Sequence, residues 1–435
     1  MLEGFSNASR IPELRRRLLW TAFFLAVYRI GVAVPTPGID GNALQAFFNA
    51  ASSTLFGWVN LFSGGALERF SVFALGIMPY ISVAIILDLL KIGWPYLDEL
   101  YKEGEAGRRK ISQYTRYGTV ALSIVQGIMI AYSLEKIQAP GGGSVVYHPG
   151  VRFIAMTVIT VTAGAVFVMW IGEQITERGV GNGISLVIMA GIVARLPSAL
   201  GTTAQFLREG EMSIFVLIGI VLIVVAVTAG IVYVETGQRR IPVQYARRVV
   251  GRRVYGGQTS HLPLKINTSG VIPPIFASSI LVFPATVATF VPSFKAWSGY
   301  LTPGGLVYNL IYVALIIFFC YFYTAVTFNP VDVADNLKKY GGFIPGIRPG
   351  RFTAEYIDRV LSRITLGGAI YVSAVCVLPT ILIQRFNVPF YFGGTALLIV
   401  VGVALDTVAQ IETHLLTRNY EGFMRRGRVK SKRGG

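Results

Sequence analysis

Three pairs of adjacent arginines lie within one stretch of the sequence, residues 235–270. Paired guanidinium groups suit bidentate contacts with phosphates or carboxylates. A second basic stretch, 327–363, contains glycines and prolines that favour exposed turns. The two stretches are therefore candidates for a docking surface for RNA or for an acidic protein face. The three pairs are Arg239-Arg240, Arg247-Arg248 and Arg252-Arg253.

Residues that could support catalysis are scarce and scattered. The three histidines, His148, His261 and His414, lack metal-ligand spacing. The sequence contains no Gly-Lys pair, and hence no P-loop for nucleotide phosphates. Ser185 could be an intramembrane nucleophile, but no histidine lies within a hydrophobic run to act as its base. We expect no enzymatic activity, no metal site and no cofactor.

The composition is that of a membrane protein. Of the 435 residues, 53% are hydrophobic and 14% are charged, against about 25% charged residues in soluble domains. This excludes a soluble enzyme, a disordered tail and a secreted disulfide scaffold. Cys320 and Cys376 both lie in hydrophobic runs, so we expect no disulfide. The net charge of +17 shows that the few charges are mostly basic.

Ten hydrophobic runs are long enough to cross a bilayer, which takes roughly 20 apolar residues per helix. We expect an all-α polytopic membrane protein with ten transmembrane helices. Ten helices divide into halves of five, 1–203 and 204–435, and an odd number makes the halves an inverted repeat. The runs are 18–34, 72–92, 117–136, 153–171, 183–203, 213–234, 271–291, 306–326, 364–384 and 393–411.

The basic residues fall mainly on one side of this topology. Of 39 lysines and arginines, 30 lie in the termini and alternate loops, and five lie in the opposite loops. The positive-inside rule then makes both termini cytoplasmic. Arg15-Arg16-Arg17 before the first run imitates a signal peptide, but no cleavage site follows, so we expect a retained anchor. The same rule predicts basic cytoplasmic loops, so topology and docking remain equally open explanations here.

Two further features leave alternatives open. Ionisable residues near the membrane are few (Arg29, Asp88, Glu173 and Asp406) and form no paired relay, which disfavours an inverted-repeat secondary transporter without excluding it. Residues 60–70 are half apolar, too short to span and broken by two glycines. They form either an interfacial loop or a re-entrant piece within a cavity, where irregular backbone is tolerated.

Several long segments resemble the SecY family, the central subunit of the bacterial protein-conducting channel. The resemblance extends from about residue 11 to residue 420. It implies ten helices in two inverted halves that close like a clamshell, with a short plug helix at about 60–70. The segments are 104–118, 172–185, 237–241, 251–265, 275–279, 335–339, 345–350 and 389–395.

The resemblance also implies roles for individual residues. A ring of isoleucines would form the pore constriction, and the spacing of two pairs by four residues places each pair on one helix face. Stiff apolar side chains would resist ion leakage by dewetting and offer a passing chain no specific hydrogen bond. The ring residues are Ile77, Ile81, Ile184, Ile188, Ile275 and Ile399, and the plug residues are Asn60, Leu61, Phe62, Ser63, Gly64, Gly65, Ala66 and Leu67.

In the same way, Ser82 and Phe283 match lateral-gate positions, Arg252 and Arg253 match loop residues that meet ribosomal RNA, and Arg348 matches the arginine that serves the motor ATPase SecA. The implied partners are SecE, SecG, SecA, the ribosome, preproteins with signal sequences, and membrane lipid. The implied function is to pass unfolded polypeptides across the bacterial inner membrane and membrane segments laterally into it. A transporter of small solutes, the alternative, would instead need a polar midplane site.

Overall fold

The chain divides into two compact units. Unit 1 comprises Met1–Gly201, Val282–Pro303 and Val403–Gly435, and unit 2 comprises Thr202–Leu281 and Gly304–Gly402. The division of the chain into inverted halves at 203/204 stays a prediction. The computed structural model describes residues 11–50, 65–137, 144–210, 213–245, 248–250, 253–255, 259–290, 305–386 and 394–430, to which all structural statements refer.

Each of the ten predicted runs overlaps a helix, although residues 72–77 form turns and the run 183–203 is interrupted at residues 194–195. Among the described residues, seven helical segments are long and apolar enough to cross a membrane, and an eighth is obtained if the bent pair α5–α6 is one span. Helices α2 (Pro12–Ala33) and α12 (Ile272–Phe290) match the two remaining runs. The predicted helical membrane fold is confirmed, and the ten-helix count is consistent with it.

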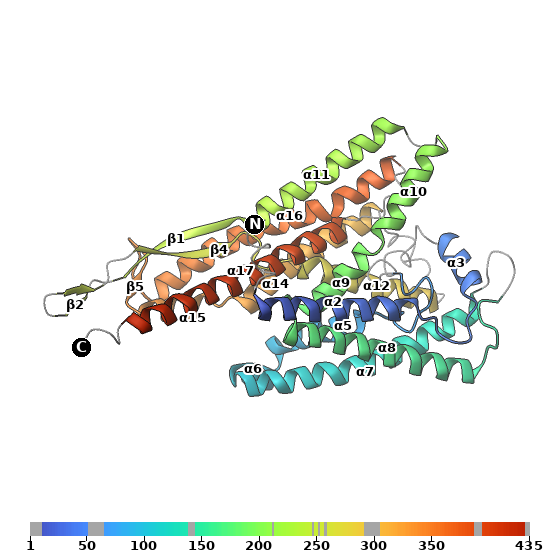
Figure 1. The fold of residues 1–435 in the computed structure, drawn as a ribbon, viewed down its shortest axis with the longest axis horizontal. Coiled ribbons are helices and arrows are strands. Elements are labelled where there is room, and N and C mark those ends of the chain that lie inside the picture. Colours follow the sequence, from blue (N-terminus) through green and yellow to red (C-terminus); the bar gives the residue numbers. More distant parts are fainter. Residues whose placement is uncertain are drawn as a thin grey trace. The chain divides into compact units, whose positions relative to one another are not determined.

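Unit 1 is built around α7 (Glu105–Lys136) and α8 (Val151–Arg178), which pack along each other (Figure 1). Helix α5 (Met78–Gly93) packs on α7 and bends by 100° into α6 (Pro95–Lys102). Helices α2 and α9 (Gly183–Val193) pack on α8. The other helices with residues in unit 1 are α3 (Gly41–Ala50), the start of α10 (Leu196–Arg208), the end of α12 from Val282 and the later part of α17 (Gly394–Lys430).

The contact between α7 and α8 depends on small side chains. The buried residues of α7 recur at nearly every fourth position, which forms one stripe along the helix. Small residues let membrane helices approach closely, and a Cβ added at Gly127 would lie only 3.1 Å from Cγ2 of Val161 on α8. Hydroxyl groups in the stripe donate to carbonyls of their own helix. The stripe is Gly107, Ile111, Thr115, Thr119, Ser123, Gly127, Ala131 and Leu134.

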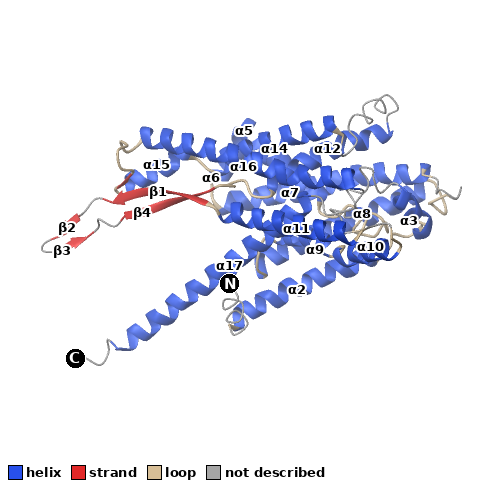
Figure 2. Cartoon of the chain, turned by 90° about the horizontal axis from the view of Figure 1, so that it is seen from above, coloured by secondary structure: helices blue, strands red, loops and turns tan. Residues whose placement is uncertain are grey.

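Unit 2 holds α11 (Ile214–Thr236), α14 (Leu306–Thr327), α15 (Pro330–Lys339) and α16 (Arg351–Phe386), with α14 and α15 packed on α16. Strand β1 (Gln238–Tyr245) pairs antiparallel with β4 (Thr259–Lys265) and, at its far end, with β5 (Gly342–Phe343). A hairpin of β2 (Arg248–Val250) and β3 (Arg253–Tyr255) continues this ribbon (Figure 2). The two basic stretches, treated as loops from sequence, therefore contain the strands.

Candidate pore, gate and docking sites

The first isoleucine pair lies where α5 begins. Ile77 is the N-cap residue, Pro79 occupies the first turn, and the Ile81 N–H donates to the Ile77 carbonyl over 3.1 Å. Both isoleucines are buried, at 4% and 8% exposure. Gly76 just before them has a φ of +55°, so the chain turns sharply into the helix at this point. Ser82, the proposed gate residue, is half-buried on the next position.

The second pair lies at the start of α9, where Asn182 caps the helix. Its Oδ1 accepts from the N–H of Ile184 at 3.1 Å and of Ser185 at 3.4 Å. Gly183 lies so close to α8 that an added Cβ would overlap the carbonyl oxygen of Gly172. Ile188, one turn along α9, is 3% exposed, and Ile184 is half-buried. The isoleucines are apolar, but polar and glycine contacts determine where their helix begins.

Three elements of unit 1 hold the turn before α9. The Oγ1 of Thr176 on α8 accepts from the Gly183 N–H at 2.9 Å and donates to the carbonyl of Gly172 at 2.9 Å. The Val180 N–H donates to Thr21 Oγ1 on α2. The Gly181 N–H donates to Gln410 Oε1 on α17, and its φ of +90° favours glycine. The N-terminus of α9 is therefore fixed by three different helices.

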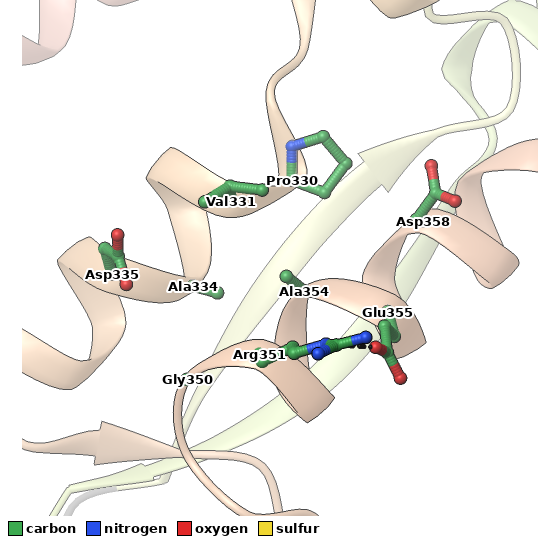
Figure 3. Close-up of a pocket in the computed structure, with 9 residues that line it drawn as sticks. All are labelled: Pro330, Val331, Ala334, Asp335, Gly350, Arg351, Ala354, Glu355 and Asp358. Atoms are coloured by element: carbon green, nitrogen blue, oxygen red, sulfur yellow. Dashed lines mark hydrogen bonds and ion pairs between the residues drawn. The ribbon is translucent and has the colours of Figure 1, made fainter.

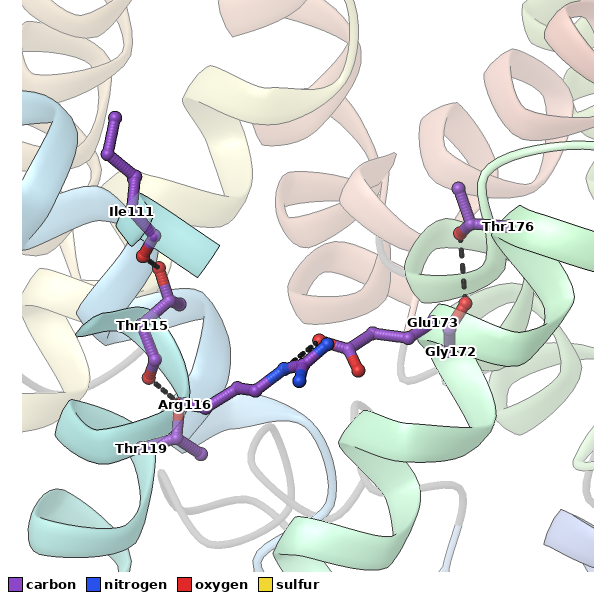
Figure 4. Close-up of polar contacts among 7 residues, drawn as sticks. All are labelled: Ile111, Thr115, Arg116, Thr119, Gly172, Glu173 and Thr176. Carbon is purple, nitrogen blue, oxygen red and sulfur yellow. Dashed lines mark hydrogen bonds and ion pairs between the residues drawn. The ribbon is translucent and has the colours of Figure 1, made fainter. Parts of the chain in front are cut away.

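An ion pair between α7 and α8 lies next to this turn. The Arg116 Nε and the Glu173 Oε1 are 2.9 Å apart, with 48% and 17% of their side chains exposed. Figure 4 shows the pair reaching between the two helices, with Thr176 one turn beyond Glu173. The sequence indicated only that Glu173 is one of few ionisable residues near the membrane. No local pattern could reveal its partner, 57 residues away.

The two remaining ring isoleucines belong to unit 2. Ile275 is 8% exposed on α12, and its carbonyl accepts from the hydroxyls of Ser278 and Ser279 at 2.9 and 2.8 Å. Ile399 is fully buried on α17. Helix α17 begins at Gly394, where an added Cβ would overlap the Val375 carbonyl of α16. In each unit, the ring positions therefore lie on closely packed helices.

Only part of the plug and gate lies within the described residues. Gly65, Ala66 and Leu67 are described, and the last two are buried at 0% and 6% exposure. Residues 65–70 form turns where a short helix was predicted, and 60–64 lie outside the described residues. Phe283 lies in α12, but its side chain and Arg252 are outside the described part, and Arg253 is described by the backbone of β3 alone.

Arg348, predicted from the sequence to be a docking residue, lies next to a packed apolar cluster. It is exposed in a turn between β5 and α16, flanked by Gly346 and Gly350 at φ +80° and +102°. The Thr353 Oγ1 donates to its carbonyl at 2.9 Å. An apolar cluster packs residues of the ribbon, the turn and α16 together. Arg348 therefore belongs to a small packed domain and not to an unsupported loop. The buried residues of that cluster are Ile241, Val243, Leu264, Ile344 and Ile357.

A groove of about 490 Å³ lies beside this turn, between α15 and the start of α16 (Figure 3). Its floor is lined by small apolar residues such as Ala334 and Ala354, and its rim carries Asp335 and Asp358. The Nε of Arg351 is 2.8 Å from the Oε1 of Glu355 across one helical turn. The surface around Arg348 thus combines a basic turn with an acidic groove.

Sequence comparison gives the family of this chain. The SecY family profile matches residues 71–408. The chain is 52% identical to the protein translocase subunit SecY of Escherichia coli over 435 residues, covering 99% of this chain and 98% of that protein. It is 46% identical to the SecY subunit of Aquifex aeolicus, covering 98% and 100%. This chain belongs to the SecY family.

Solved structures show the same fold. A protein-conducting channel superposes with a TM-score of 0.63 at 18% identity, covering 93% of this chain and 96% of that one. Sec61 in a canine ribosome–channel complex superposes with a TM-score of 0.59 at 16% identity, covering 93% and 96%. The SecY-family chain is therefore a multi-pass protein of the bacterial inner membrane and a protein-conducting channel. The family prediction is confirmed, and the transporter alternative is not supported.

Proposed function

We propose that this SecY-family channel constricts its pathway with six isoleucines, Ile77, Ile81, Ile184, Ile188, Ile275 and Ile399. The support is their chemistry and their local placement. All six are apolar and β-branched, and five of them are less than 9% exposed. An apolar constriction excludes ions by dewetting and makes no hydrogen bond with a translocating backbone. The channel can then pass any sequence and still limit leakage.

The regions around this constriction have distinct roles in the proposal. Ser82 and Phe283 line a lateral gate through which apolar helices enter the lipid, at about −0.3 to −0.6 kcal/mol for each leucine-like residue. Residues 60–67 form a plug. A solved SecY structure with a TM-score of 0.65 comes from work in which the plug domain stabilises the closed state and maintains a membrane seal. We extend that role to this chain.

The basic surface faces the cytoplasm and docks the machines that drive translocation. Both termini lie on that side, because 30 of the 39 basic residues fall there. Arg252 and Arg253 contact ribosomal RNA, and Arg348 contacts SecA, which supplies energy from ATP. SecE and SecG complete the channel. The support is the exposure of Arg348 on a packed base and the ribosome complexes of the canine and yeast structural relatives.

The observation that carries the proposal is the apolar, buried character of the ring positions on closely packed helix starts. The test is reconstitution of the chain with SecE in vesicles, with SecA and ATP outside. We expect a radiolabelled preprotein to become protease-protected only when ATP and a functional signal sequence are both present. Protection without ATP, or for a chain lacking a signal sequence, would contradict the proposal. Uptake of a small solute in place of the preprotein would favour a transporter.

A further inference from the structure

An ion pair connects residues 65–71 (the plug segment), which include the described end of the proposed plug, to the end of α9. The Arg195 Nη2 and the Glu68 Oε2 are 2.9 Å apart, although the residues are 127 positions apart in the sequence. The two side chains are 24% and 27% exposed. Water screens a pair of this burial less than it screens a fully exposed pair. The ion pair therefore contributes to the free energy that holds the plug segment in this position.

Hydrogen bonds fix the backbone of Arg195, so its side chain can hold a neighbouring segment in place. The residue lies between the last turn of α9 and the first turn of α10, and its N–H donates to the Ile192 carbonyl at 3.2 Å. Its own carbonyl accepts from the N–H of Ala199 at 3.0 Å and from the hydroxyl of Ser198 at 2.8 Å. The guanidinium thus extends from an anchored helix junction.

The guanidinium reaches the plug segment at two places. One is the carboxylate of Glu68. The other is Gly65, where φ is +88° and an added Cβ would lie 3.4 Å from Nη2 of Arg195. Glycine both permits this backbone conformation and leaves room for the arginine. The Arg195 side chain therefore pairs with the middle of the segment and lies beside its start.

The plug segment itself has little regular structure to hold it. It consists of turns, and Phe70 adopts a φ of +40°, which is unfavourable for a residue with a side chain. Its far end is secured by backbone bonds to residues 34–36, since the Thr36 N–H donates to the Phe70 carbonyl at 2.9 Å and the Val72 N–H donates to the Val34 carbonyl at 2.9 Å. At the near end, the ion pair with Arg195 holds the segment, as these backbone bonds do at the far end.

We propose that Arg195 is a positioning residue that holds the plug segment in its seated position through Glu68. The inference rests on the proposed function, namely that this segment belongs to a plug. Displacing the plug segment away from the α9–α10 junction breaks the ion pair, so the pair favours the seated state alone. A contact made in one state shifts the equilibrium by its own free energy. Partly exposed pairs are worth a factor of about two to five in such an equilibrium.

The test compares charge reversals with a charge swap in the full chain reconstituted with SecE. The variants are Glu68→Arg, Arg195→Glu and the double swap. We expect each reversal to raise ion leakage from vesicles, and to raise export of a reporter with a weakened signal sequence, by about two- to tenfold. The swap should return both towards the parent values, because it restores the pair with reversed polarity.

Two further variants test whether the effects of the reversals come from a change of net charge or from poor folding. Arg208→Glu places the same charge change at the exposed C-terminal end of α10, and we expect it to leave both readouts unchanged. Glu68→Gln keeps the side-chain shape and removes only the charge, so it remains informative if a reversal fails to accumulate. A smaller rise than that of Glu68→Arg is the expected result.

The failures of the two proposals can be told apart by deleting residues 60–67. If the deletion raises leakage but neither Glu68→Gln nor the reversals do, the ion pair has no positioning role and the plug remains. If the deletion leaves leakage unchanged, the plug assignment itself fails. A double swap that behaves no better than the single reversals would also overturn the pairing of Arg195 with Glu68.

Discussion

The helix starts of unit 1 and the proposed docking domain of unit 2 place polar and apolar residues in opposite ways. At α5 and α9 the proposed functional residues are buried isoleucines, and the polar groups around them, such as Asn182 and Thr176, hold backbone in place. In the docking domain (β1, β4, β5, α15 and the start of α16), the apolar residues form the core and the arginine projects outward.

In each region, one class of residue supports the fold and the other class carries the proposed function. Removing a polar or glycine support at α9 should disturb the fold, whereas a change in an isoleucine's polarity should alter the seal. In the docking domain the roles are reversed, because exposed arginines contribute little to stability and much to contact with partners. Four predictions test that contrast.

The largest effect is expected from Arg348→Glu. The reversal places a carboxylate where the proposal requires a guanidinium contact with SecA, so SecA-driven export should fall to background while the channel stays folded and inserted. Export is measured by protease protection of a preprotein in vesicles. Arg359→Glu is the matched control, because Arg359 is an exposed arginine of α16 that does not line the groove beside Arg348. Normal export by the Arg348→Glu variant would refute the role of this arginine.

The next effect tests the support of α9. Gly183→Ala adds a Cβ that overlaps the Gly172 carbonyl oxygen, and backbone must move to relieve it. We expect a loss of about 1–3 kcal/mol, seen as a lower Tm of the purified complex in detergent. Gly201→Ala is the control, because no atom lies within 4 Å of its added Cβ. An unchanged Tm for Gly183→Ala would show that the two helices are less tightly packed than described.

A moderate effect is expected when the ring becomes polar. Ile81→Thr and Ile188→Thr keep the β-branch but add a hydroxyl, which favours wetting of the constriction. Ion leakage from vesicles should therefore rise, by a larger factor when the two changes are combined. Ile→Val at the same positions removes one methylene, stays apolar and should leave the leakage near the parent value. Equal leakage in the Thr and Val variants would indicate that size rather than polarity forms the seal.

The smallest effect concerns Arg253 at the tip of the ribbon. If this side chain contacts a ribosomal phosphate, Arg253→Ala should lower the slope of log affinity against log salt by about 0.7–0.9. Titration of ribosomes onto vesicle-bound channel at several salt concentrations gives that slope. Lys265→Ala on β4, paired with the opposite end of β1, should leave the slope unchanged. A slope that responds equally to both changes would remove the tip from the interface.

The membrane helices could be predicted from sequence, because a spanning segment is a local property. A run such as 214–236 must be apolar along its own length to cross a bilayer. The candidate isoleucines could be named as well, but through long shared motifs and not through their own chemistry. A buried isoleucine in a membrane helix has no distinguishing local signal.

The remaining features depend on contacts between distant segments. The ribbon of β1 and β4 left a weak signal, since Ile241 and Val243 are separated by the exposed Pro242, and Leu262 and Leu264 by the exposed Pro263. The clustered arginines dominate this stretch, so the strands were not recognised from the sequence. The pairs Arg116–Glu173 and Glu68–Arg195 join residues 57 and 127 positions apart, and one sequence carries no record of such pairing.

The central claim is that a translocating chain passes through the isoleucine ring, and site-specific crosslinking tests it most directly. A photoreactive residue is placed at Ile188 and at Ile275, and a stalled preprotein is trapped in the channel with SecA and ATP. We expect strong crosslinks from both positions, and none from the same probe at Ile218, a half-exposed position on the apolar helix α11. Crosslinks from Ile218 with none from Ile188 and Ile275 would contradict the claim.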